Sequence, residues 1–103
     1  MNLLAKHCPD AFARFSEFGK TVMQEGALPA KVKELIACGL SIASHCEPCL
    51  KHHLSAAIKA GATETEIAET LAVCLLFLGG PANVWTRKAI EETLAGTQGA
   101  TAQ

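Results

Sequence analysis

Two cysteines separated by two residues are the part of the sequence best suited to chemistry. Cys46 and Cys49 flank Glu47 and Pro48 at the expected start of a helix. Unpaired amides and the helix dipole at such a position stabilise a thiolate, the form of cysteine that attacks peroxides and disulfides. The spacing also lets both sulfur atoms join in one disulfide bond. The pair therefore indicates thiol–disulfide redox chemistry.

A histidine and a glutamate could supply the proton transfer that this chemistry needs. His53 follows Cys49 by four residues, so both side chains project from the same face of a helix. A neutral imidazole there could take the thiol proton, and an imidazolium could stabilise the thiolate. Glu34 would reach His53 only if the chain reverses near His45 and the two flanking helices pack antiparallel. It could then orient the imidazole and relay its proton, although both residues are also compatible with an ordinary solvated surface.

The other cysteines and histidines have simpler interpretations. Cys38 and Cys74 lie in apolar helical segments, and we expect them to be buried core residues. Cys8 precedes the first long helix. No role is assigned to the other histidines, which are His7, His45 and His52.

Five helices are expected to carry these residues. Proline and glycine punctuation and the apolar periodicity place them at about residues 9–25, 29–44, 46–61, 63–78 and 81–95. The clearest boundary is a capping box, in which Thr63 is followed three residues later by Glu66. The sequence predicts an all-α fold, a compact bundle with the Cys-x-x-Cys pair at the N-terminus of the third helix. Residues 1–95 would form one domain and residues 96–103 a flexible tail.

Composition favours self-association. The chain has 103 residues, enough for one domain, and 50% of them are hydrophobic. A domain of this size does not readily bury that much apolar surface alone. The segment from Ile67 to Leu78 is apolar on nearly every side and must be enclosed. We therefore expect a homo-oligomer whose core is shared between subunits.

Charge and hydropathy exclude other classes. The formal net charge is −1 and there is no basic stripe, so nucleic acid is not an expected partner. No apolar run is long enough for a signal peptide or a membrane span, so we expect no membrane partner and a cytoplasmic location. An odd number of cysteines, five, argues against a secreted disulfide framework.

Four of these residues carry a resemblance to a known family. Glu34, Cys46, Cys49 and His53 match the Glu…Cys-x-x-Cys-x-x-x-His signature of AhpD-like alkylhydroperoxidases, which belong to the wider carboxymuconolactone decarboxylase family. Residues 60–67 and 78–81 are also similar to the small single-domain members. The resemblance extends over about residues 28–94.

The resemblance implies an all-α AhpD-like fold, an obligate oligomer (commonly a trimer or a hexamer) and an activity that reduces peroxides or disulfides. Cys49 would be the attacking thiol and Cys46 the resolving thiol, with His53 as the base and Glu34 as the start of the proton relay. The substrate would be a hydroperoxide or a disulfide, and the reductant a lipoyl protein or a small dithiol. No cofactor is implied.

One position departs from the family pattern. The prototype peroxidase has a histidine immediately before the second cysteine, where this chain has Pro48. The departure removes one member of the proton relay and affects peroxidase turnover more than disulfide exchange. His45 is near enough in sequence to substitute.

Three alternatives remain open. The decarboxylase branch of the family would process a lactone acid, and it works without a redox cysteine pair. A metal-binding module would need a tetrahedral ligand set. The residues available to it are Cys46, Cys49, His52 or His53, and Cys8 or His7. The third alternative is a non-catalytic oligomeric scaffold, whereas a thioredoxin-type protein would need strands that the sequence does not supply.

Overall fold

A computed structural model describes residues 2–102, with side-chain surroundings over residues 2–96, and places six helices there. They are α1 (Leu3–His7), α2 (Pro9–Val22), α3 (Ala30–Ala43), α4 (Glu47–Lys59), α5 (Glu64–Leu78) and α6 (Gly80–Ala102). No strand occurs between residues 2 and 102, which confirms the predicted all-α fold. The five expected helices correspond to α2–α6. The additional helix, α1, is a short segment capped by the Asn2 side chain, which accepts from the amides of Leu4 and Ala5.

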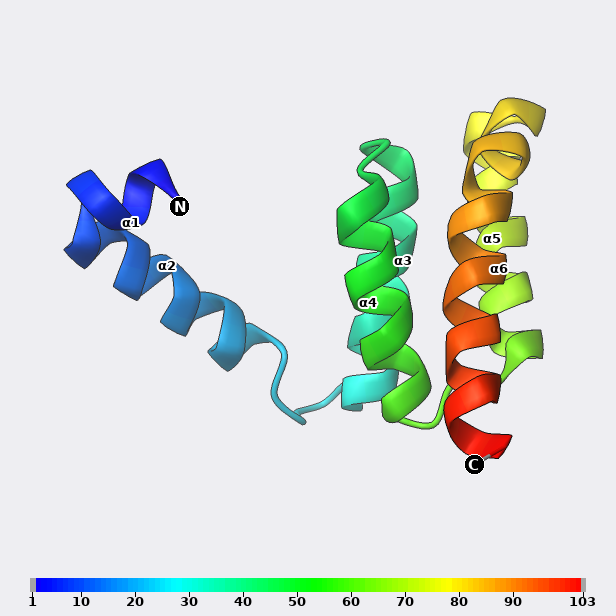
Figure 1. The fold of residues 1–103 in the computed structure, drawn as a ribbon, viewed down its shortest axis with the longest axis horizontal. Coiled ribbons are helices and arrows are strands. Elements are labelled where there is room, and N and C mark those ends of the chain that lie inside the picture. The colour runs from blue at the N-terminus through cyan, green and yellow to red at the C-terminus, as the bar shows by residue number, and fades with distance from the viewer. Residues whose placement is uncertain (1, 103) are drawn as a thin grey trace.

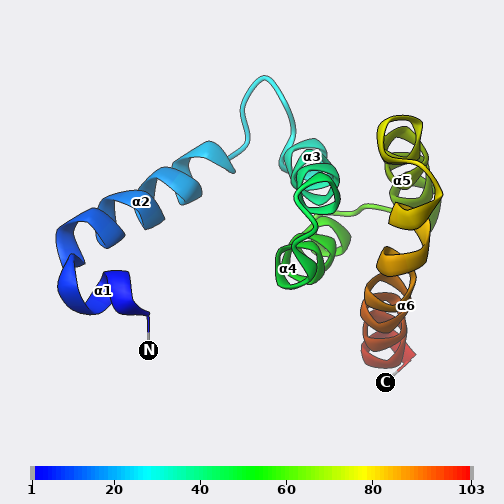
Figure 2. The same ribbon diagram turned by 90° about the horizontal axis from the view of Figure 1, so that it is seen from above.

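The helices form a four-helix body and a separate N-terminal arm (Figures 1 and 2). In the body, α3 packs against α4 and α5, and α6 completes the group by packing against the same two helices. Ion pairs also join these helices, Lys31 to Glu66 at 2.9 Å and Lys51 to Glu92 at 3.2 Å. The arm consists of α1 and α2, which pack on each other and point away from the body.

The arm is a feature that the predicted helical bundle did not include. The first expected helix is α2, and its apolar residues Phe15 and Phe18 remain exposed because it does not lie along the body. Among the described helices, only α3–α6 make up the packed group.

The core lies within the body. Its buried apolar residues are Cys38, Ile42, Leu50, Leu54, Ala57, Ile67, Ala82 and Ala89. Leu50 and Leu54 of α4 are almost completely enclosed. Small residues at Ala82 and Ala89 of α6 allow close approach of the neighbouring helices. Between them, the buried hydroxyl of Thr86 donates to the Ala82 carbonyl at 2.6 Å and so keeps a hydrogen-bond partner.

The fourth expected helix, α5, starts as predicted but is only partly enclosed. The Thr63 hydroxyl accepts from the Glu66 amide at 3.1 Å, and the Glu66 carboxylate accepts from the Thr63 amide at 2.8 Å, which confirms the capping box. The helix ends at Gly79, whose φ of 78° suits glycine. Only Ile67 of α5 is buried within this chain.

The C-terminal helix continues beyond the expected boundary, because α6 extends to Ala102. Gln103 and the side chains of residues 97–102 lie outside the described part of the chain, so the flexibility of the tail at 96–103 stays a prediction. Over the described residues, no helix combines the length and the apolarity that a membrane crossing requires.

Candidate functional site

A tight turn between α3 and α4 places the cysteine pair. The Cys46 amide donates to the Ser41 carbonyl at 2.9 Å, and the His45 amide donates to the Ile42 carbonyl at 3.1 Å. These two bonds form a Schellman motif, in which His45 takes the left-handed position usually held by glycine, with φ of 55°. Cys46 follows at once as the N-cap of α4. The helix α3 therefore ends shortly before the first cysteine, and α4 begins directly after it.

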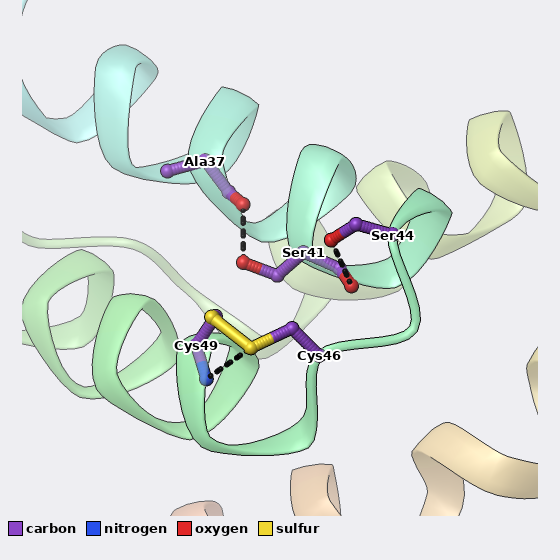
Figure 3. Close-up of a disulfide and its surroundings, with 5 residues drawn as sticks. All are labelled: Ala37, Ser41, Ser44, Cys46 and Cys49. Atoms are coloured by element: carbon purple, nitrogen blue, oxygen red, sulfur yellow. Dashed lines mark hydrogen bonds between the residues drawn. A yellow bond between two sulfur atoms is a disulfide. The ribbon is translucent and has the colours of Figure 1, made fainter.

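Cys46 and Cys49 are joined in a disulfide, with their Cα atoms 5.3 Å apart (Figure 3). The Cys46 sulfur also accepts from the Cys49 amide at 3.3 Å, which ties it to the first turn of α4. Cys49 is exposed, whereas Cys46 is half-buried. The structure therefore represents the oxidised form of the pair.

Glu34 and His53 meet across the α3–α4 hairpin. The antiparallel packing of the two helices brings Glu34 Oε2 to 2.9 Å from His53 Nδ1. The side chains are 13% and 26% exposed, so water screens this contact less than it would on the surface. An ionised carboxylate only accepts, so Nδ1 carries the hydrogen in this pair and Nε2 is left as the ring nitrogen that can take a proton.

Two cysteines outside the pair, Cys38 and Cys74, have thiols with raised pKa values. Cys38 lies on α3 one turn after Glu34 and is buried, as expected. Burial, the nearby Glu34 carboxylate and Cys74 together raise the pKa of the Cys38 thiol to about 12. Cys74 is half-buried rather than buried, because part of α5 faces outward. Burial also raises the pKa of the Cys74 thiol, which lies 3.9 Å from the Gly39 carbonyl.

Ser41 is a polar neighbour of the disulfide that the sequence reasoning missed. It is buried on the side of α3 that faces the disulfide (Figure 3). Its hydroxyl donates to the Ala37 carbonyl at 2.7 Å, and its own carbonyl accepts from the Ser44 hydroxyl at 3.3 Å. The available signal was helical spacing, because Ser41 lies seven residues after Glu34 and so falls on the same face of α3.

Trp85 was also missed, although it is the only tryptophan of the chain. Its ring stacks on His45, with centroids 4.1 Å apart and planes 16° from parallel. The stack connects α6 to the turn that carries Cys46. Beside it lies an open hollow of about 370 Å³, lined among others by Ile42 and Leu78.

The remaining histidines do not assemble a metal site. His52 is exposed and contacts the His53 ring edge-on, with centroids 4.9 Å apart. Cys8 belongs to the arm, between α1 and α2. In the part of the chain that is described, no group of three or more histidine, cysteine, aspartate or glutamate side chains is placed to hold a metal ion. The two sulfur atoms of the Cys-x-x-Cys pair form a disulfide with each other.

Known proteins share both the sequence and this architecture. Residues 9–92, from the start of α2 to well inside α6, match the sequence model of the Carboxymuconolactone decarboxylase family. An uncharacterized protein of Cupriavidus necator is 39% identical over 82 residues, which cover 80% of this chain and 73% of that protein. An uncharacterized protein of Methanocaldococcus jannaschii is 33% identical over 94 residues, 89% of each protein.

Solved structures agree with the sequence matches. A carboxymuconolactone decarboxylase family protein from Legionella pneumophila superposes with a TM-score of 0.80 at 33% identity, over 89% of this chain and 82% of that one. A family protein from Thermotoga maritima, for which a part in the antioxidative response has been suggested, gives 0.82 at 26% identity, over 90% and 96%. The chain therefore belongs to the carboxymuconolactone decarboxylase family.

Proposed function

We propose that the protein is a thiol–disulfide oxidoreductase of AhpD-like type that reduces a hydroperoxide or a disulfide through Cys49 and Cys46. The observation that carries the proposal is the hydrogen bond between Glu34 and His53 on the same hairpin as the disulfide. A cysteine pair at a helix start supplies the thiolate, and an oriented imidazole supplies the proton transfer.

In the first step, His53 Nε2 takes the proton of the Cys49 thiol. The thiolate then attacks the terminal oxygen of a hydroperoxide, and the O–O bond breaks with its electron pair on the leaving oxygen. That oxygen takes the proton from the His53 imidazolium and leaves as an alcohol. Cys49 is oxidised to a sulfenic acid, while the Glu34 carboxylate stabilises the transient charge on His53.

In the second step, the Cys46 sulfur attacks the sulfur of Cys49. The S–O bond breaks, and the hydroxide leaves as water with the Cys46 proton. The product is the disulfide that the structure contains. An external dithiol, lipoyl or small, returns two electrons and is itself oxidised to a disulfide. This cycle suits the cytoplasm, where dithiols are kept reduced.

The two cysteines are assigned by exposure and position. Cys49 is exposed and lies one helical turn before His53, so it is the sulfur that a substrate reaches and that a base serves. Cys46 is half-buried at the N-cap and suits the resolving role. With a disulfide as substrate, Cys49 forms a mixed disulfide and Cys46 displaces the bound half. The relay is assigned to Glu34 and His53 alone, because the His45 ring is stacked on Trp85.

The test counts free thiols. Fully reduced protein has five per chain. One equivalent of tert-butyl hydroperoxide should remove two from the wild type within the first turnover. Cys49→Ser should lose neither, and Cys46→Ser should stop at a sulfenic acid that dimedone traps. Cys8→Ser is the control, because it removes an exposed cysteine of the arm and should still lose two thiols. Full retention of thiols in the wild type, or loss of two in Cys49→Ser, contradicts the proposal.

The decarboxylase activity in the family's name is the second candidate. The same Glu34–His53 pair could act as an acid–base pair on a lactone acid. A variant with both Cys46 and Cys49 changed to serine separates the two candidates. If it still decarboxylates a muconolactone acid and the wild type consumes no peroxide, the second candidate replaces the first.

A further inference from the structure

Ser41 carries a buried hydroxyl that the proposed cycle does not use. The residue is 5% exposed and lies on the face of α3 that also carries Glu34 and Cys38. Its side chain points toward the disulfide of Cys46 and Cys49 (Figure 3). A hydroxyl that is so well enclosed must find its hydrogen-bond partners within the protein. Those partners therefore indicate what the hydroxyl does.

The backbone of the turn keeps Ser41 beside the cysteine pair. The Ser41 carbonyl accepts from the Cys46 amide at 2.9 Å, and the Cα atoms of Cys46 and Cys49 are 5.3 Å apart. The same carbonyl accepts from the Ser44 hydroxyl at 3.3 Å. The main chain of residue 41 is thus tied to the turn, and only its side chain is left to change partners.

The present partner of the Ser41 hydroxyl does not depend on it. The hydroxyl donates to the Ala37 carbonyl at 2.7 Å. That carbonyl lies four residues earlier in α3, so it also accepts the Ser41 amide in the regular helical pattern. It keeps a hydrogen bond if the hydroxyl turns away. Rotation about the Cα–Cβ bond of Ser41 can therefore redirect the donor without leaving a buried acceptor unpaired.

The two sulfur atoms of the pair differ in their donors. The Cys46 sulfur accepts from the Cys49 amide at 3.3 Å, because Cys46 is the N-cap of α4. Over residues 2–96, no such bond reaches the Cys49 sulfur in the oxidised form. A thiolate carries a full charge, and a hydrogen bond to a charged acceptor is stronger than one to a neutral carbonyl. After reduction, a Cys49 thiolate is therefore a better acceptor for the Ser41 hydroxyl than Ala37 is.

We propose that Ser41 donates a hydrogen bond to the Cys49 thiolate when the disulfide is reduced, and returns to the Ala37 carbonyl when it closes. The inference rests on the proposed function for the role of Cys49. In the reducing step, an external dithiol gives two electrons to the S–S bond and closes to its own disulfide. Its two protons pass to Cys46, as a thiol, and to His53, beside the Cys49 thiolate. Ser41 keeps its own proton and stabilises that thiolate.

Other ionisable groups surround the cysteine pair or contact its neighbours, and the test must leave them in place. They are Glu34 and Cys38 on α3, His45 in the turn, Glu47, Lys51, His52 and His53 on α4, and Glu92 on α6. Ser41→Ala removes none of these groups and none of their printed ion pairs or ring contacts. A change in a pH profile of Cys49 in this variant therefore reports the hydroxyl.

The test measures the alkylation of Cys49 over a pH series. Cys46→Ser keeps Cys49 reduced, iodoacetamide labels it, and peptide mass spectrometry follows the rate. Adding Ser41→Ala should move the midpoint of the profile to higher pH. Below the midpoint, alkylation should slow about tenfold, the size expected for one hydrogen bond to a charged group. The rate on the high-pH plateau should not fall, because an unassisted thiolate is at least as nucleophilic.

Two further variants separate the hydroxyl from packing. Ser41→Thr keeps a hydroxyl and should restore the original profile. Ser44→Ala removes the exposed hydroxyl of the same turn and should leave the profile unchanged. An unshifted midpoint in Ser41→Ala, an equal shift in Ser44→Ala, or the alanine profile in a Ser41→Thr protein with unchanged circular dichroism overturns the proposal.

A second measurement uses protein that retains both cysteines. In equilibrium with reduced and oxidised dithiothreitol, above the midpoint of the Cys49 profile, Ser41→Ala should favour the disulfide up to about tenfold more than the wild type, because its reduced form lacks one hydrogen bond. An equal or opposite equilibrium contradicts the inference. Neither measurement uses a peroxide, so a protein that consumes no peroxide would refute the proposed function and leave this inference standing.

Discussion

At the scale of single residues, the site depends on one hydrogen bond between residues 34 and 53. The Glu34 carboxylate selects the tautomer of His53 that carries its hydrogen on Nδ1. In the proposed cycle, it also stabilises the imidazolium that forms when the ring takes the Cys49 proton. The same carboxylate contributes to the raised pKa of Cys38, whose side chain therefore stays a thiol near neutral pH.

Replacing Glu34 by glutamine tests this dependence. The amide nitrogen of glutamine can donate to Nδ1, which leaves the hydrogen on Nε2, where a base must have none. We expect the rate of peroxide consumption with a small dithiol to fall about 10–100-fold, within the range of general base catalysis. Glu47→Gln removes a carboxylate beside Cys46 and should stay within about threefold of the wild type. An unchanged rate in Glu34→Gln would mean that His53 needs no orienting partner.

The thiols should differ in their rate of alkylation. Because the folded pKa of Cys38 is about 12, its thiolate is scarce at pH 8, and burial blocks access as well. With the Cys46–Cys49 disulfide intact, iodoacetamide at pH 8 should label the exposed Cys8 first and Cys38 last. Peptide mass spectrometry over time measures the order. Equal labelling of Cys8 and Cys38 in folded protein contradicts the described burial.

At the scale of elements, a ring stack and an ion pair are two of the contacts that link α5 and α6 to the α3–α4 hairpin. The His45–Trp85 stack holds α6 against the turn that carries Cys46, and it accompanies a left-handed histidine that costs about 1–2 kcal/mol relative to an ordinary conformation. The Lys31–Glu66 ion pair joins α3 to the first turn of α5. Glu66 therefore serves both the capping box and the contact between helices.

The ion pair predicts a dependence of stability on pH. The hydrogen bond from Lys31, followed by that from the Thr63 backbone, lowers the pKa of Glu66 below its ordinary value of 4.5. Because the folded value is depressed, the stabilisation is present above pH 4.5 and is lost as the pH falls through the folded value. The Tm of the wild type should exceed that of Glu66→Gln at pH 7, and the difference should shrink steadily as the pH falls below 4.5. Glu69→Gln, an exposed change on the same helix, serves as control. A difference that does not shrink as the pH falls contradicts this account.

At the scale of the whole molecule, the arm and the body are two packed units joined by residues 23–29. The body has its own core, and the arm carries an apolar stripe whose Phe15 and Phe18 stay exposed. Lys33 sets the direction of the arm through two bonds to the end of α2. The predicted association of subunits should therefore depend on Lys33, at the base of the arm.

Lys33→Ala tests that dependence. Without its ammonium group, the end of α2 loses two hydrogen bonds and the arm samples more directions, so association costs more conformational entropy. The dissociation constant of the assembly should rise about tenfold, as measured by analytical ultracentrifugation over a dilution series. Lys20→Ala on α2 is the control and should associate like the wild type. An unchanged constant for Lys33→Ala would show that the arm direction is set elsewhere.

Features that depend on neighbouring residues could be predicted from the sequence alone. Helix punctuation, the Thr63–Glu66 capping box and the all-α class follow from local bonds within a few residues. Two features of the site also depend on nearby residues only. They are the position of Cys46 and Cys49 at a helix start and the four-residue spacing between Cys49 and His53. The resemblance added the family. These features need no knowledge of how helices pack.

Contacts between residues far apart in the sequence depend on how the helices pack and could not be predicted in the same way. The contact of Glu34 with His53 depends on the antiparallel packing of α3 and α4, and the stack of His45 on Trp85 depends on where α6 returns. The projecting arm was not predicted, because an apolar stripe on α2 looks the same whether its partner lies in the same chain or in another. The periodicity of apolar residues shows that one face of a helix must be buried. Which surface buries that face depends on how whole helices pack.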